Sequence, residues 1–266
     1  MNMTPLSGSN KIVVVGGGAA GMMAAGMAAQ AGAQVTLLEQ NGRLGKKLLI
    51  TGKGRCNVTN DCPWQDALQS VPTNPRFLYS ALAGFSPADA KKFFEDYGCA
   101  LKTERGNRVF PVSDRSQSVL DALERFLRAY HVRILPRKAA EIAVSDGRVT
   151  GVKTAEGPVP ADCVVLATGG LSYPATGSTG SGYAMAQALG HTIIEPTGSL
   201  VPLVEKGHDC AKMQGLALKN IAVKLVNTKG KTVYEDFGEL LFTHFGLSGP
   251  VILSASAHMA RGEAGY

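Results

Sequence analysis

Residues 11–39 read KIVVVGGGAAGMMAAGMAAQAGAQVTLLE, and this stretch decides the fold. A short run rich in β-branched residues leads directly into three glycines with the spacing Gly16-x-Gly18-x-x-Gly21. A segment rich in alanine and methionine follows, and then a second apolar run that ends in the acid Glu39. This order predicts a βαβ unit that holds the pyrophosphate and ribose of a dinucleotide.

Each of these residues has a separate task in such a unit. Gly16 permits a sharp turn, Gly18 lets the backbone approach the pyrophosphate, and Gly21 lets the helix pack close to the strand. The N–H groups at the helix start face the phosphates. Glu39, 18 residues after Gly21, would accept hydrogen bonds from the ribose, which favours FAD or NAD over NADP. The predicted site also takes in the adjoining Ala19, Ala20 and Gln40.

Two simpler interpretations of this stretch compete with a dinucleotide site. A tight turn without a ligand is conceivable, because glycine is abundant, with 32 in 266 residues. A membrane span is conceivable as well, since residues 12–29 are almost free of polar side chains. Three consecutive glycines and a polar N-terminal segment argue instead for a buried strand and helix. We therefore expect no signal peptide and no contact with a membrane.

Composition narrows the class of protein. The chain is 45% hydrophobic and 18% charged, with a net charge of +6. No nucleic-acid module accompanies the basic residues, so we expect no nucleic-acid partner. Five cysteines without a CxxC pair indicate a reducing compartment, the cytoplasm, with neither disulfides nor a zinc site. The scattered histidines offer no metal-ligand spacing. The oligomeric state is left open.

The pattern along the chain predicts an α/β fold with two domains. A Rossmann-like FAD-binding domain would span residues 1–195, with a helical portion at about 61–130. Ser86 and Pro87 mark one helix start, and Ser116 is expected to cap another. The apolar run 163–167 suits a central parallel strand. Residues 196–266 alternate apolar and polar positions, which predicts an incomplete antiparallel, barrel-like β domain.

Four segments together carry a resemblance to a known family: GGGAAGMMAA (16–25), GKKLLITGKGRCNVTN (45–60), ATGGLSYPATGSTGSGY (167–183) and GELLFTHFGLSGP (238–250). The chain resembles the BaiN-like flavoproteins, also described as aminoacetone-oxidase-like FAD-binding proteins. The resemblance runs over essentially the whole chain. It implies an FAD-binding domain with an inserted β-barrel domain and a small helical part.

The resemblance also implies which further residues meet the cofactor. The loop after the second strand would lie along the flavin, and its glycines and basic residues suit an anionic ligand. A short strand would hold the adenine through a backbone group at Ala139. Small residues at the end of the apolar run 163–167 and directly after it would leave room for the cofactor. The implied residues are Lys46, Lys47, Thr51, Gly52, Arg55, Cys56, Asn57, Ala139, Ala167, Thr168, Gly169 and Gly170.

This chain departs from the family pattern at two places. Ser181 stands where an acid is usual, and the sequence stops at Tyr266, before the expected final strand and glycine-rich helix over the flavin. The chain thus resembles a fragment or a naturally shortened product. We expect weak FAD retention from it.

The function that these features indicate is FAD-dependent oxidoreduction. Hydride would pass between flavin and either a small-molecule substrate or NAD(P)H as electron donor. Alternatives are an NAD-dependent dehydrogenase, a truncated, non-catalytic dinucleotide-binding module and a basic nucleic-acid binder. No acid–base pair stands out, so the catalytic residues are left unknown, with His244 and Tyr173 as candidates only.

Overall fold

A computed structural model of the chain describes residues 10–259. These residues form two compact units, which we describe separately. The first comprises residues 10–71 and 75–193, and the second comprises residues 72–74 and 194–259. Among the described residues, no helix is both long and apolar enough to cross a lipid bilayer.

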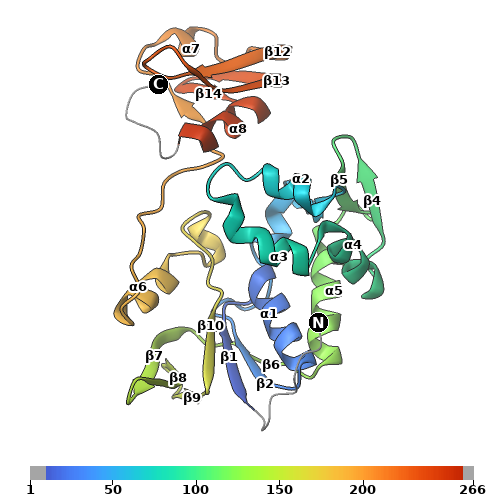
Figure 1. Cartoon of the computed structure of the whole chain (residues 1–266), viewed down its shortest axis with the longest axis vertical. Coiled ribbons are helices and arrows are strands. Elements are labelled where there is room, and N and C mark those ends of the chain that lie inside the picture. Colours follow the sequence, from blue (N-terminus) through green and yellow to red (C-terminus); the bar gives the residue numbers. More distant parts are fainter. Residues whose placement is uncertain (1–9, 260–266) are drawn as a thin grey trace. The chain divides into compact units, whose positions relative to one another are not determined.

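A four-stranded parallel sheet organises the first unit (Figure 1). Its order is β10 (Cys163–Leu166), β1 (Lys11–Val15), β2 (Gln34–Leu38) and β6 (Arg133–Leu135). The predicted strand–helix–strand order is confirmed, with α1 (Ala19–Gln30) between β1 and β2. The run 163–167 is not a central strand, however. Among the described residues β10 pairs only with β1, so it lies at the edge of the sheet.

The two faces of this sheet bury different side chains, because alternate residues of a strand point to opposite sides. Val14 and Leu37 face a core formed with α1 and α5 (Ser116–Ala129). Val13 and Leu38 face a second core under the antiparallel sheet of β7 (Ala139–Ser145), β8 (Arg148–Thr154) and β9 (Val159–Pro160). This layering places the carboxyl ends of the parallel strands beside the start of α1.

The predicted helical portion contains several short elements and one small sheet. Besides α5, the helices are α2 (Trp64–Gln69), α3 (Tyr79–Gly84) and α4 (Pro87–Asp96), with the 3-10 turn η2 (Pro75–Leu78). Another 3-10 turn, η1 (Leu48–Gly54), precedes this portion. The sheet has the order β3 (Thr59–Asn60), β5 (Arg108–Pro111) and β4 (Leu101–Glu104). The unit continues with η3 (Pro174–Thr176) and α6 (Ser181–Ala188).

Of the two predicted helix starts, one is confirmed and the other is wrong. Ser86 caps α4 in a capping box with Asp89, and Pro87 is its first residue, as predicted. Ser116 does not cap α5, because it is the first helical residue and Arg115 occupies the cap position. The Ser116 hydroxyl instead donates to the carbonyl of Leu49, 2.8 Å away, and so ties α5 to η1.

The second unit is a four-stranded antiparallel sheet with two helices. Its order is β11 (Leu203–Val204), β14 (Gly246–Ser248), β13 (Thr232–Thr243) and β12 (Ala217–Val226). The helices are α7 (Asp209–Lys212) and α8 (Pro250–Met259). The predicted antiparallel β region after the parallel sheet is confirmed. Residues 260–266, the predicted end of this region, lie outside the described residues.

Candidate functional site

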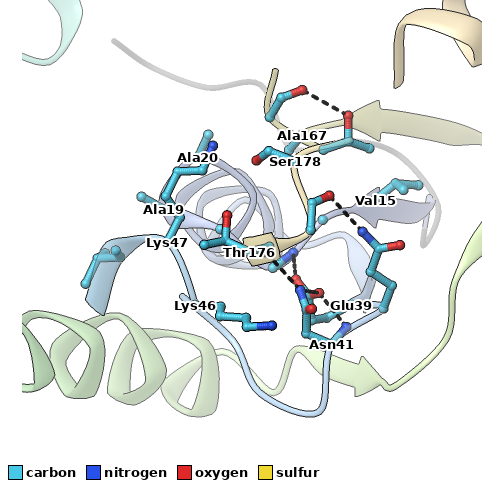
Figure 2. Close-up of a pocket in the computed structure, with 18 of the residues that line it drawn as sticks. Val15, Ala19, Ala20, Glu39, Asn41, Lys46, Lys47, Ala167, Thr176 and Ser178 are labelled. Atoms are coloured by element: carbon cyan, nitrogen blue, oxygen red, sulfur yellow. Dashed lines mark hydrogen bonds between the residues drawn. The ribbon is translucent and has the colours of Figure 1, made fainter. Parts of the chain in front are cut away.

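A cavity of about 460 Å³ opens where β1, β2 and β10 end beside the start of α1. All of its lining residues belong to the first unit. The cavity brings together most of the residues predicted from the sequence, and Figure 2 shows a part of this lining. The predicted residues that line it are Gly16, Gly18, Ala19, Ala20, Glu39, Gln40, Lys46, Lys47, Thr51, Cys56, Asn57, Ala139, Ala167, Thr168 and Gly169.

Four predicted residues lie outside this lining: Gly21, Gly52, Arg55 and Gly170. Gly21 supports the site from behind, because a side chain there would collide with the carbonyl oxygen of Gly16. Gly52 takes a left-handed conformation, with φ of 55°, within η1. A side-chain carbon at Gly170 would lie 3.1 Å from the hydroxyl of Tyr183. These glycines serve the packing around the cavity.

The glycines of the fingerprint Gly16-x-Gly18-x-x-Gly21 differ in which atoms surround them. Gly16 has a φ of 109°, and a side-chain carbon there would lie 2.5 Å from the Ala167 oxygen. At Gly18, by contrast, such a carbon would meet nothing within 4 Å. Gly18 also has an extended backbone, with φ of −79°, which every residue type can adopt. No protein contact therefore requires glycine at position 18, and Gly18 belongs to the lining of the cavity.

Glu39 lies at the end of β2 with only 8% of its surface exposed. Its Oε2 accepts a hydrogen bond from the Gly17 backbone N–H at 2.8 Å. Its Oε1 accepts two more, from the backbone N–H and the Nδ2 of Asn41, each at 2.7 Å. A side-chain carbon at Gly17 would lie 2.9 Å from Oε2, so glycine there makes room for the carboxylate. The acid is buried, but its charge is compensated by hydrogen bonds.

A segment that we call the strap, residues 172–177, is bound to the loop after β2. Four side chains of that loop donate hydrogen bonds to it. Gln40 and Asn41 donate to the carbonyls of Gly177 and Thr176, at 2.8 and 3.2 Å. Lys46 donates to the carbonyl of Ala175 at 2.7 Å, and Lys47 to the Ser172 hydroxyl at 3.3 Å. Both lysines line the cavity as predicted, but their ammonium groups bind the strap.

Arg55 is turned toward carboxylates, away from the predicted cofactor contact. Its guanidinium forms ion pairs with Glu104 and Asp114, each at 2.5 Å, and lies 4.2 Å from the centre of the Phe110 ring. The hydrogen bonds that Arg55 donates, first to Glu104 and then to Asp114, raise the pKa of its guanidinium. The adjacent Cys56 is buried and lines the cavity, and burial raises the pKa of its thiol. A raised pKa disfavours the reactive thiolate.

Neither catalytic candidate lines the cavity. Tyr173 is exposed, with a left-handed backbone at the strap, and His244 lies in the turn between β13 and β14 of the second unit. The sequence reasoning missed several residues that do line the cavity. They are Val15, Gly17, Leu38, Asn41, Leu48, Val58, Phe94, Val119, Arg137, Lys138, Thr176, Gly177, Ser178, Ser181 and Met185. Gly17 and Asn41 could have been found, since each adjoins a residue that the fingerprint names.

Comparisons with known proteins agree with this geometry. The model of a family described as "HI0933-like protein Rossmann domain" matches residues 10–249. A 3-dehydro-bile acid delta(4,6)-reductase of Clostridium scindens is 38% identical over 256 residues, covering 95% of this chain and 61% of the relative. A ribosomal RNA dihydrouridine synthase of Escherichia coli is 32% identical over 252 residues, covering 94% and 61%. The chain therefore spans about three fifths of the length of these relatives.

One solved structure supports the fold assignment. A flavocytochrome c3 fumarate reductase in its open conformation has a TM-score of 0.50 and 20% sequence identity. The match covers 79% of this chain and 47% of that structure. At this identity the likeness concerns the fold alone. It agrees with the Rossmann-like fold predicted from the sequence.

Proposed function

Because the chain belongs to the HI0933-like Rossmann-domain family, we propose that it forms the cofactor-binding part of an FAD-dependent oxidoreductase. The observation that carries the proposal is the open side of Gly18 beside the buried acid Glu39. The start of α1 and the acid Glu39 line one cavity, where the helix N–H groups would meet the pyrophosphate and Glu39 the ribose. This donor and acceptor set fits the pyrophosphate and ribose of FAD.

The remaining lining residues have proposed places along the cofactor. The backbone of Ala139 would hold the adenine, and residues 167–169 would leave space at the strand ends. Thr51, Cys56 and Asn57 would lie along the flavin. Four basic residues line the cavity against the single acid, Glu39: Lys46, Lys47, Arg137 and Lys138. This excess of positive charge favours an anionic ligand.

The names of the two relatives suggest a reaction class. A delta(4,6)-reductase and a dihydrouridine synthase both reduce carbon–carbon double bonds. In a 3-oxo steroid diene and in uracil, the double bond is conjugated to a carbonyl, which makes its far carbon a hydride acceptor. We propose that the protein reduces such a bond with NAD(P)H as electron donor. Bound FAD would supply the hydride-transfer chemistry, while the chain supplies binding and orientation.

The alternatives make different predictions about the bound nucleotide. An NAD-dependent dehydrogenase would use the same βαβ unit but release NAD, and a non-catalytic module would bind FAD without turnover. The chain is therefore incubated with equal concentrations of FAD and NAD, separated from free nucleotide by rapid gel filtration and denatured, and the released nucleotide is identified. We expect FAD, and release of NAD in its place would contradict the proposal.

The reaction class is tested without oxygen, with FAD, NADPH and either a 3-oxo-4,6-diene steroid or unmodified ribosomal RNA. We expect reduction of one of the two, measured by mass spectrometry. Glu39→Ala should lose activity at limiting FAD and regain it at saturating FAD, since it removes a charged hydrogen-bond acceptor that contributes about 1.5–3 kcal/mol. If the FAD-loaded chain reduces neither substrate, the assigned reaction is wrong.

A further inference from the structure

Asn41 is the residue through which Glu39 and the strap are connected. Among the described residues, it supplies the only side-chain hydrogen bond to the Glu39 carboxylate, at 2.7 Å. The same amide nitrogen donates to the carbonyl of Thr176 at 3.2 Å (Figure 2). A side-chain amide nitrogen carries two hydrogens, so both are used. The amide cannot rotate without losing both contacts.

The neighbouring strap residue leaves room for this amide. Gly177 has a φ of 100°, and a side-chain carbon there would lie 2.7 Å from the Asn41 Nδ2. Glycine at position 177 therefore fits both the backbone conformation and the space that Asn41 occupies. The strap and the amide form one packed arrangement beside the acid.

The two oxygens of Glu39 are consequently held from opposite sides. The terminal torsion of a glutamate side chain is broad, so a free carboxylate would sample many orientations. Here Gly17 fixes Oε2, and Asn41 fixes Oε1 through its backbone and its side chain. A carboxylate has about four acceptor sites, of which these three bonds leave about one open. The acceptor site of the Glu39 carboxylate that remains open therefore has a fixed direction.

We propose that Asn41 is a positioning residue that orients the Glu39 carboxylate toward the ribose hydroxyls of the dinucleotide. The inference rests on the proposed function, because it assumes that the cavity binds the ADP half of FAD. Orientation before binding saves the conformational entropy that the carboxylate would otherwise lose. Asn41, which also lines the cavity, therefore contributes to recognition of the ribose hydroxyls through the orientation of Glu39.

The test measures how much the ribose hydroxyls contribute to binding. ADP and 2′,3′-dideoxy-ADP each compete with FAD for the full-length chain, and the ratio of their dissociation constants is the readout. In the wild-type chain we expect the dideoxy analogue to bind at least about tenfold more weakly. Asn41→Leu and Asn41→Ala should lower this ratio at least threefold. Adding Asn41→Leu to Glu39→Gln should leave the ratio of the single Glu39→Gln variant unchanged.

A matched control is Asn60→Leu, since the Asn60 amide also donates to a backbone carbonyl, that of Gly106, but lies outside the cavity lining. Its ratio should equal that of the wild type. A merely structural role of Asn41 would weaken both ligands equally, and an unchanged ratio in both Asn41 variants would overturn the inference alone. If the wild-type chain bound neither FAD nor ADP, the proposed function itself would be overturned, and the inference with it.

Discussion

At the scale of single residues, the three fingerprint glycines Gly16, Gly18 and Gly21 differ in which atoms surround them. Gly16 and Gly21 are required by the chain itself, because a side chain at either position would press against a backbone oxygen. Gly18 has no such neighbour within 4 Å. Because Gly18 lines the cavity and no protein contact requires its lack of a side chain, a ligand that approaches its backbone best explains this glycine. The ligand assignment therefore depends most on Gly18.

Cys56 and Cys99 are expected to be chemically inert. Cys99 is only 1% exposed, and burial raises the pKa of its thiol to about 11. Burial likewise raises the pKa of Cys56. At pH 8 iodoacetamide should therefore label the exposed Cys163 before Cys56 or Cys99, as measured by mass spectrometry of the peptides. In denaturant all three should react alike. Preferential labelling of native Cys56 would instead indicate a reactive, redox-active thiol.

At the scale of elements, Arg55 connects the end of η1 to the small antiparallel sheet of β3, β5 and β4 and to the turn before α5. It pairs with Glu104 in β4 and with Asp114, while Lys102 in β4 also pairs with Asp114. Arg55 lowers the pKa of Glu104, and Lys102 followed by Arg55 lowers the pKa of Asp114. This network fixes the segment whose following residues, Cys56 and Asn57, line the cavity.

The network predicts a stability difference that depends on pH. Carboxylates with a lowered folded-state pKa contribute stability above their unfolded pKa of about 4, and that contribution is lost as the pH falls through the folded value. Arg55→Met should therefore lower the free energy of unfolding at pH 7, and the difference should shrink by pH 3. Urea denaturation of both chains at pH 7 and at pH 3 measures this difference in the free energy of unfolding.

Arg108→Met serves as the control, because Arg108 also lies near the Phe110 ring but donates to the carbonyl of Arg105 and to no described carboxylate. Its effect should change little with pH. An equally pH-independent effect of Arg55→Met would show that stacking on Phe110, and not ion pairing, holds Arg55.

Local patterns explain which elements were predictable. The helix at Pro87 follows from Ser86, Pro87 and Asp89, whose contacts all lie within one turn. Ser116 looks the same in sequence, but its hydroxyl is taken by Leu49, 67 residues away. The strap was missed for a similar reason, because its four donors lie 125 to 137 residues away along the chain. Hydrogen bonds across such separations leave no periodic signal in the sequence.

At the scale of the whole molecule, the cavity and the second unit are separable. All lining residues of the cavity lie in the first unit, and the antiparallel sheet of β11 to β14 forms the second. The chain spans about three fifths of the curated relatives that it matches. We propose that residues 196–266 correspond to the inserted β-barrel domain that the family resemblance implies. We therefore expect cofactor binding to depend on residues of the first unit.

The most direct test of the account is a titration of FAD into the wild-type chain and its Gly18→Ala and Gly42→Ala variants, followed by flavin fluorescence. A side-chain carbon would meet nothing within 4 Å at either glycine, but Gly42 lies outside the cavity lining. We predict saturable binding of one FAD by the wild-type chain and by Gly42→Ala. Gly18→Ala should bind at least about tenfold more weakly, with a free energy of unfolding changed by no more than about 1 kcal/mol. Equal affinity of all three chains, or no saturable binding of FAD by the wild-type chain, would contradict the claim that this cavity holds the dinucleotide.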